Sequence, residues 1–231
     1  MSYDDRYISF FSDDNIYVLD LSSGEYTQLT SDNSDMYPQF GIDNKIYFAH
    51  FLGEDYDSAL MRMDVDGNNL EEVCQLPHAI QQIFPGQSDT DIIYFICYNR
   101  KFMRLQISSG ECIELHEFSS TYDIVTRTED DRYFNFSRRS KTQYLYDTQT
   151  DICESYYYPV GNSSCAAKIF PDRKEALIYN YHYGAILMIW DIENNIQIGE
   201  DIIVGDTDLG GHSEFAISPN GQKAAIIQRT E

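Results

Sequence analysis

The amino-acid sequence predicts an all-β protein built from a repeated unit of four short strands. A hairpin pattern recurs five times, as IYVLDLSSGEYTQL, LMRMDVDGNNLEEV, FMRLQISSGECIEL, QYLYDTQTDICESY and ILMIWDIENNIQIG. The residues that close the first strand of each hairpin follow one another at intervals of 44, 42, 41 and 44 residues: Asp20, Asp64, Gln106, Asp147 and Asp191. Segments such as KIYFAHF, IIYFICY and RYFNFSR are short, aromatic and bounded by turn residues, which excludes a helical repeat. This period, with four strands per unit, is typical of a β-propeller.

Each repeat also contains an upstream hairpin, so we name its four strands a, b, c and d in chain order. The expected a–b hairpins are YPQFGIDNKIYFAHF, AIQQIFPGQSDTDIIYFICY, DIVTRTEDDRYFNFSR, CAAKIFPDRKEALIYNY and EFAISPNGQKAAIIQR. Turns are expected at Asp43-Asn44, Glu129–Asp131, Pro171–Arg173 and Pro219–Gly221, because Pro, Asp, Asn and Gly supply the backbone angles that turns require.

The two ends of the chain supply incomplete repeats. Tyr7 to Thr30 provides strands b, c and d, and Ser213 to Arg229 provides a and b. The simplest closure pairs the C-terminal a–b with the N-terminal c–d in one composite blade, which removes exposed sheet edges. This predicts a single domain over residues 1–231 with five blades, and Tyr7–Phe11 as a surplus strand. The alternatives are six units, one of them split or incomplete, or a fragment of a longer chain.

Composition limits the classes of partner. The chain has 16 Lys and Arg against 38 Asp and Glu, a net charge of −22, so it repels nucleic acid and anionic membranes. A basic partner is easier to accommodate, although solvation alone would also explain the acidity. An aromatic content of 14% argues against disorder.

The cysteines and the N-terminus indicate a reducing compartment. The five cysteines have no C-x-x-C spacing, which argues against a disulfide framework and a zinc site and predicts small buried thiols. The N-terminus lacks a signal-peptide pattern, and no apolar run reaches the length that spans a bilayer. We therefore expect a cytoplasmic protein, or one delivered by a route that needs no cleavable signal.

Motifs for catalysis are missing. The sequence contains no G-x-S-x-G, H-E-x-x-H or G-x-x-x-x-G-K-[ST], so we predict no catalytic residue, cofactor or metal. Asp64–Asn68 is similar to a calcium loop, but Arg62 stands where an EF-hand needs an acidic residue, so a c–d turn is expected. His78 and His212 each precede a strand a and are candidates for the axial opening of a propeller; a structural role for His212 is the alternative.

The chain resembles the WD40-like and TolB-like β-propeller repeat families. The resemblance depends on Trp190-Asp191, on Gly211-His212 before a strand a, and on the hairpins Ser218–Lys223 and Met63–Leu70. One repeat carries the Trp-Asp pair and one carries Gly-His, so most of the histidine–aspartate network of WD repeats is missing. The resemblance implies a fold, and a fold does not determine function.

Basic and aromatic residues gather in the b–c loops, which leave a propeller on the same face as the d–a loops. We predict a partner-binding surface there, composed of Tyr98, Arg100, Lys101, Arg138, Arg139, Lys141, Tyr181 and His182. Guanidinium groups suit carboxylates and phosphates, and tyrosines supply contact area. The alternative is a solvated set of loops in which the cations pair with nearby Asp and Glu.

These observations favour a non-enzymatic recognition scaffold. It would bind a protein or peptide, with acidic or phosphorylated groups, through the face that carries the b–c and d–a loops. The family resemblance implies an alternative, a lyase or hydrolase acting on acidic saccharides with a metal at the axial opening. A third possibility is a subunit whose partner chain completes the ring. Nucleic acid and membranes are not expected partners, and the oligomeric state is left open.

Overall fold

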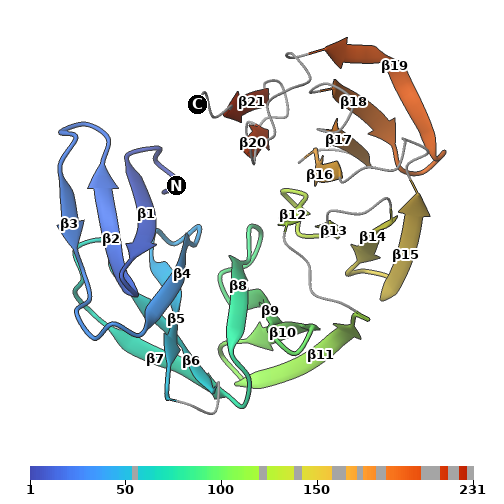
Figure 1. The fold of residues 1–231 in the computed structure, drawn as a ribbon. Coiled ribbons are helices and arrows are strands. Elements are labelled where there is room, and N and C mark those ends of the chain that lie inside the picture. Colours follow the sequence, from blue (N-terminus) through green and yellow to red (C-terminus); the bar gives the residue numbers. More distant parts are fainter. Residues whose placement is uncertain are drawn as a thin grey trace. The chain divides into compact units, whose positions relative to one another are not determined.

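The described part of the chain consists entirely of β-strands and their connections. The computed structural model describes residues 1–53, 57–119, 124–137, 142–157, 165–170, 174–180, 186–203, 214–217 and 224–227. Within these residues 21 strands form six antiparallel sheets, and no helix is present (Figure 1). The all-β prediction is confirmed. The chain divides into two compact units, Met1–Thr121 and Tyr122–Glu231, which are described separately. The prediction of a single domain stays a prediction.

Unit 1 begins with a three-stranded sheet, sheet A. It contains β1 (Tyr7–Ser12), β2 (Asn15–Asp20) and β3 (Tyr26–Gln28) in that order. β1 pairs with β2 along its whole length, from Tyr7 opposite Asp20 to Ser12 opposite Asn15. The prediction that Tyr7–Phe11 is a surplus strand is therefore wrong. β1 and β3 occupy both edges of β2, so no other strand can pair with β2 in a composite blade.

Two four-stranded sheets complete unit 1. Sheet B contains β4 (Asp35–Phe40), β5 (Ile46–Phe51), β6 (Ser58–Met63) and β7 (Glu71–Leu76), and sheet C contains β8 (Ile80–Pro85), β9 (Ile92–Cys97), β10 (Lys101–Gln106) and β11 (Glu111–Glu117). In each sheet the spatial order follows the chain order a, b, c, d. The turn at Asp43-Asn44 is confirmed, since Asn44 adopts a φ of 59° and its N–H donates to the carbonyl of Gly41.

The Asp64–Asn68 segment is the expected c–d turn of sheet B. The backbone N–H of Asp64 donates to the carbonyl of Asn68, and that of Gly67 donates to the carbonyl of Asp64. Gly67 has a φ of 82°, a conformation that costs glycine little and other residues more. The calcium-like spacing thus reflects turn geometry.

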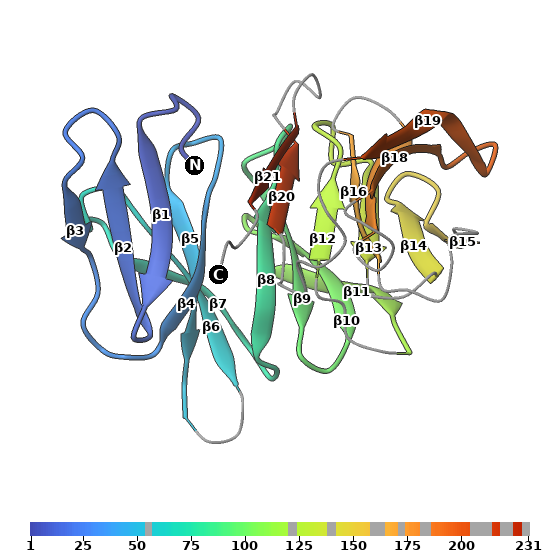
Figure 2. The ribbon, with the colours of Figure 1, turned by 45° about the horizontal axis from the view of Figure 1, so that its top comes forward.

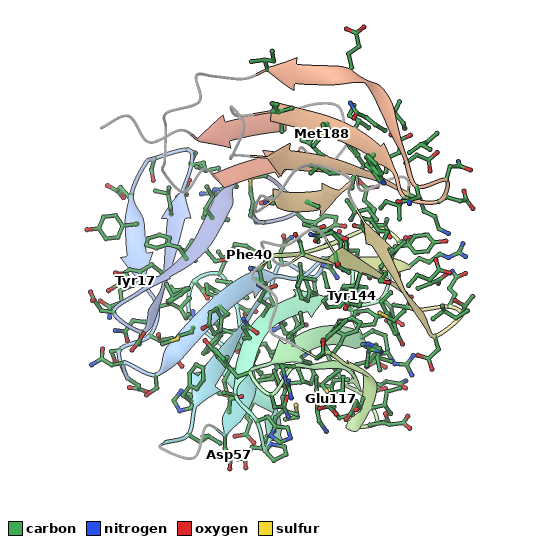
Figure 3. All side chains as sticks on the ribbon, turned by 45° about the vertical axis from the view of Figure 1, so that its right-hand side comes forward. Tyr17, Phe40, Asp57, Glu117, Tyr144 and Met188 are labelled. Carbon is green, nitrogen blue, oxygen red and sulfur yellow. The ribbon has the colours of Figure 1, made fainter. Side chains whose placement is uncertain are left out.

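Alternating apolar residues form the core of unit 1. Ile16 and Val18 of β2 pack with Phe40, Phe48 and Met63 of sheet B. A second cluster joins sheets B and C through apolar residues from β5, β8, β9 and β10: Tyr47, Ile83, Phe95 and Leu105. Phe40 is buried in the core of unit 1, whereas Tyr17 lies toward the outer side of sheet A (Figure 3). Each such buried side chain contributes roughly 1.5–3 kcal/mol of transfer free energy.

Unit 2 contains two further four-stranded sheets and, among the described residues, one two-stranded sheet. Sheet D contains β12 (Ile124–Arg127), β13 (Tyr133–Ser137), β14 (Thr142–Asp147) and β15 (Ile152–Tyr157); sheet E contains β16 (Cys165–Ile169), β17 (Glu175–Asn180), β18 (Ile186–Asp191) and β19 (Ile196–Ile203); sheet F contains β20 (Glu214–Ile217) and β21 (Ala224–Ile227). The Glu129–Asp131 turn is confirmed, with a φ of 57° at Asp131. The expected turns at Pro171–Arg173 and Pro219–Gly221 lie outside the described residues.

The core of unit 2 lies between sheets D and E. It contains Leu145 of β14 together with Ile169, Ile178, Met188 and Trp190 of sheet E. The indole N–H of Trp190 donates to the side-chain oxygen of Asn195, 3.3 Å away, in the adjoining c–d turn. The Trp-Asp pair therefore contributes to the core and to the turn of its own sheet.

Aspartate carboxylates stabilise the c–d turns at the recurring anchor positions. Each accepts a hydrogen bond from within its turn: Asp20 from the backbone N–H of Ser22 (2.8 Å), Asp64 from the side chain of Asn69 (2.5 Å), Asp147 from the N–H of Gln149 (2.9 Å) and Asp191 from the N–H of Asn194 (3.0 Å). Hydrogen bonds stabilise the ionised form, and those from the side chains of Ser22, Asn69 and Asn194 are the largest cause of the lowered pKa values of Asp20, Asp64 and Asp191.

A second recurring position lies immediately before strand b. A cation there pairs with the anchor aspartate in three repeats: Arg6 with Asp20 (2.9 Å), Lys45 with Asp64 (3.0 Å) and Arg132 with Asp147 (3.2 Å). The repeat in sheet C exchanges the two roles, because Asp91 precedes β9 and the anchor is Gln106. The Asp91 carboxylate accepts hydrogen bonds from the hydroxyl (2.6 Å) and backbone N–H (2.7 Å) of Ser108, which lower its pKa. The 41–44-residue period thus reflects a turn contact that recurs along the chain, with the two roles exchanged in sheet C.

Buried polar side chains connect neighbouring sheets within each unit. In unit 1 the Ser58 hydroxyl donates to the carbonyl of His78 (2.9 Å) and accepts from the N–H of Ile80 (3.1 Å). In unit 2 the Ser137 hydroxyl accepts from the N–H of Ala167 (3.2 Å), and the Asn135 amide donates to the carbonyl of Ala167 (3.3 Å). Each contact satisfies backbone groups of the next strand a that would otherwise be buried without partners.

The described cysteines agree in part with the prediction of buried thiols. Cys97 is buried, Cys74 and Cys153 are half-buried, and Cys112 is exposed; all four are free thiols. Burial raises the pKa of Cys74 and of Cys97 to about 12, which suppresses the reactive thiolate. The prediction was wrong for Cys112, because edge strand β11 points this side chain to solvent.

Candidate partner-binding face

The expected binding face corresponds in unit 1 to the end where the b–c and d–a connections emerge. The β1–β2, β7–β8 and β9–β10 connections lie together along the lower edge of unit 1 in Figure 2. They bring together the Asp13-Asp14 turn, the Pro77-His78 connection and the Tyr98–Arg100 turn. We call this end of unit 1 the loop face.

Four of the residues selected from the sequence can be placed there. Tyr98 and Arg100 form the β9–β10 turn, Lys101 begins β10, and His78 precedes β8. The remaining candidates lie outside the described residues: Arg138, Arg139, Lys141, Tyr181, His182 and His212.

The cations of the β9–β10 turn already have protein partners. The Lys101 ammonium lies 2.7 Å from a carboxylate oxygen of Glu114, and this hydrogen bond raises the pKa of Lys101. Arg100 donates to the carbonyl of Ser119 (2.8 Å) and lies 3.9 Å from a carboxylate oxygen of Glu117. Arg100 has a φ of 73°, and its guanidinium contacts lie at the end of β11 and just beyond it. Within the described residues these two cations match the solvated-loop alternative better than an open anion site.

Three aromatic side chains form a continuous line across the loop face. The rings of Phe11 and Tyr37 meet edge to face with centroids 5.4 Å apart, and the hydroxyls of Tyr37 and Tyr98 are 2.5 Å apart. These residues come from β1 of sheet A, β4 of sheet B and the β9–β10 turn of sheet C. Phe11 is 42% exposed and Tyr98 is 48% exposed. We call this set the aromatic line.

Local backbone geometry sets the positions of these rings. Phe11 pairs opposite Ile16, so it continues the core-facing side of β1 beyond the point where the core ends. Tyr37 has a φ of 58°, within an irregularity of the β4–β5 pairing between Met36 and Gln39. Such a conformation in a bulky residue carries strain of about 1–3 kcal/mol and is concentrated at functional sites. Partial burial and the Tyr98 hydroxyl raise the pKa of Tyr37, so its hydroxyl stays protonated.

Carboxylates adjoin the aromatic line at the β1–β2 turn. Asp13 and Asp14 follow closely on Phe11 and have φ values of 48° and 56°, the left-handed turn that two-residue hairpins favour. The Asp14 carbonyl accepts from the N–H of Asp35 at the start of β4, and the Asp14 charge acts on Tyr37. Among the ion pairs of the described residues, none involves Asp13 or Asp14.

The loop face also contains a histidine–aspartate contact. Nδ1 of His50 lies 2.8 Å from a carboxylate oxygen of Asp35, whose side chain is 3% exposed. His78 contributes its carbonyl to the Ser58 contact. In the part of the chain that is described, no group of three or more His, Cys, Asp or Glu residues is placed to hold a metal ion.

The sequence interpretation found Tyr98 but missed Phe11 and Tyr37. Phe11 belongs to the strand that was expected to be surplus, and its role follows from the pairing of β1 with β2. Tyr37 depends on a pairing irregularity that strand periodicity does not reveal. The one available signal was the Tyr37-Pro38 dipeptide, because proline disturbs regular strand pairing.

Comparisons of the sequence with family models and with curated proteins supply no relative. No family model matches the chain, and no curated protein matches it in sequence. The described residues contain no helix long and apolar enough to cross a membrane. Inferences about function therefore depend on the geometry of the loop face.

Proposed function

We propose that the protein is a non-enzymatic β-propeller recognition scaffold that binds a protein or peptide through the face with the b–c and d–a loops. The exposed aromatic line carries the proposal. Tyrosine and phenylalanine supply much of the binding energy at protein interfaces, where they bury large area at low entropic cost. Here they bridge three sheets, so a partner would contact a surface that the fold holds in place.

The propeller assignment is supported by the repeat and by the four complete antiparallel sheets in which spatial order follows chain order. Pairing of β1 with β2 favours the alternative of six units, one of them split or incomplete, over five blades closed through β2. The alternative of an acidic-saccharide lyase depended on His78 and His212 at an axial opening. No described residue adds an observation in its favour.

A partner with acidic or phosphorylated groups remains a proposal for three of the five basic residues of the predicted surface. Arg138, Arg139 and Lys141 lie outside the described residues, whereas Arg100 and Lys101 already bind Glu117 and Glu114. The aromatic line is therefore the better starting point for an experiment.

Site-specific photocrosslinking tests the proposal. A photoreactive residue replaces Tyr98 on the loop face or, as a control, the 70% exposed Tyr26 on sheet A. We expect position 98 to capture a defined partner in cells that express the protein, and position 26 to capture none. Equal capture from both positions, or no capture from position 98, would contradict the proposed face.

A further inference from the structure

The aromatic line and the adjoining carboxylates resemble two contacts that the chain completes internally with arginine. The guanidinium of Arg6 stacks 4.8 Å above the ring centroid of Tyr7 and binds Asp20 at 2.9 Å. Arg132 does the same with Tyr133 at 4.8 Å and Asp147 at 3.2 Å. In both contacts one cation joins an aromatic face to a carboxylate. An arginine side chain suits this combination because its flat cation stacks on a ring while its N–H groups bind a carboxylate.

The loop face has the ring and the carboxylate of this arrangement without its cation. Phe11 and Tyr98 expose their rings, and Asp13 and Asp14 adjoin Phe11. Among the described residues no cation pairs with either carboxylate or stacks on either ring. The nearest basic turn offers none, because Arg100 and Lys101 are bound by Glu117 and Glu114.

We infer that the partner of the loop face is a cationic peptide segment, with an arginine or lysine that stacks on the aromatic line and pairs with the Asp13-Asp14 turn. This inference rests on the proposed function and names the chemistry of the partner. Charge complementarity supports it, since the body carries a net charge of −22 and attracts cationic segments from a distance. The surface carboxylates alone would bind weakly. The exposed rings add a local contact for the cation, so the peptide would bind at this face and would not only be attracted to the protein as a whole.

The experiment measures binding of a fluorescent peptide to the full chain by anisotropy. The probe is a nine-residue peptide with three arginines separated by Gly and Ser, and its matched control replaces each arginine with neutral citrulline. We expect the arginine peptide to bind at least roughly fivefold more tightly, the discrimination that one or two charge and cation–π contacts provide.

Matched variants separate the loop face from the charge of the whole body. Asp13→Asn combined with Asp14→Asn keeps side chains that tolerate positive φ, and we expect it to weaken arginine-peptide binding by roughly fivefold. The control, Glu25→Gln with Glu111→Gln, removes the same charge from exposed positions beside c–d turns at the other end of unit 1. We expect it to change binding by less than about twofold, because exposed charges at a distance are screened. Thermal unfolding of each variant confirms that it folds.

The aromatic variants make the two proposals separable. Tyr98→Ala is expected to weaken binding by roughly tenfold, as for an interface aromatic, and Tyr26→Ala to leave it unchanged. If arginine and citrulline peptides bind equally and Tyr98→Ala weakens both, the cationic inference is overturned and the loop face stands. If Tyr98→Ala has no effect on either peptide, or neither peptide binds, the peptide-binding role of this face is overturned as well. If the Asp13/Asp14 variant and the Glu25/Glu111 control weaken binding of the arginine peptide equally, the effect comes from the overall charge of the protein. That result would overturn the inference.

Discussion

Single carboxylates have distinct roles that their environments define. Asp13 is exposed and Asp14 is half-buried, and among the described residues neither pairs with a cation. The anchor aspartates close turns, and Asp131 lies in a buried ion pair. The Asp131 carboxylate is 2.6 Å from a guanidinium nitrogen of Arg127, with side-chain exposures of 6% and 13%. Losing one partner of a buried pair leaves the other charge desolvated, which costs more than the pair itself contributes.

Replacement of Asp131 should therefore be severe for a residue in a turn. We expect Asp131→Ala to lower the free energy of unfolding by about 3 kcal/mol. Asp131→Asn should cost less, because asparagine tolerates the φ of 57° and still accepts a hydrogen bond. Urea unfolding monitored by fluorescence measures both. The neighbouring exposed Glu129→Ala is the control, and an equal loss in that variant would contradict the buried-pair account.

The anchor aspartates predict a dependence of stability on pH. Burial acts to raise the pKa of Asp147, but hydrogen bonds from Arg132 and from the N–H of Gln149 outweigh it, so the pKa is lowered on folding. A carboxyl group with a lowered pKa stabilises the fold above its unfolded pKa of about 4, and this contribution is lost as the pH falls through the folded value. We expect Asp147→Asn to be less stable than the wild type at pH 7 and to lose less stability between about pH 4 and 2. Parallel acid unfolding curves for the two proteins would refute this assignment.

At the scale of the element, sequence periodicity predicted most hairpins closely. The c–d strands begin and end within a few residues of the expected positions, because alternating apolar residues and Asp, Asn or Gly turns act locally. The pairing of Tyr7–Ser12 with β2 was missed because the repeat period shows how many strands to expect. It does not show with which neighbouring strand each one pairs. Tyr37 was missed for a related reason, since its position depends on an irregular pairing. Three of the five predicted cations lie outside the described residues, and the other two are paired with glutamates.

Contacts between sheets depend on a few buried polar side chains. Ser58 satisfies two backbone groups of the connection into β8, and it is fully buried. We expect Ser58→Ala to cost about 1–3 kcal/mol, because the N–H of Ile80 would lose its partner in a dry environment. Thermal unfolding measures the loss. Ser155→Ala, at an exposed position of β15, is the control and should fall within about 0.5 kcal/mol of the wild type.

At the scale of the whole molecule, the net charge of −22 is the dominant electrostatic property. The ion pairs of the described residues are mostly exposed, and such pairs contribute little. Self-repulsion should therefore exceed their attraction, and salt should stabilise the fold by screening it.

We expect the melting temperature to rise when the ionic strength increases from about 10 to about 150 mM. Differential scanning calorimetry with sodium chloride measures the change, and tetramethylammonium chloride at the same concentrations separates screening from specific sodium binding. A melting temperature that falls with salt would show that the attractive pairs prevail over the repulsion.

The exchange of Asp91 and Gln106 in sheet C limits how freely the repeats can be recombined. A consensus module assembled from these five repeats would take Asp at the anchor and Lys or Arg before strand b. Introducing Asp at position 106 alone would set two carboxylates against each other, since Gln106 now donates to Asp91. When repeats are combined or transplanted in protein engineering, the anchor residue and the residue before strand b must therefore be changed together.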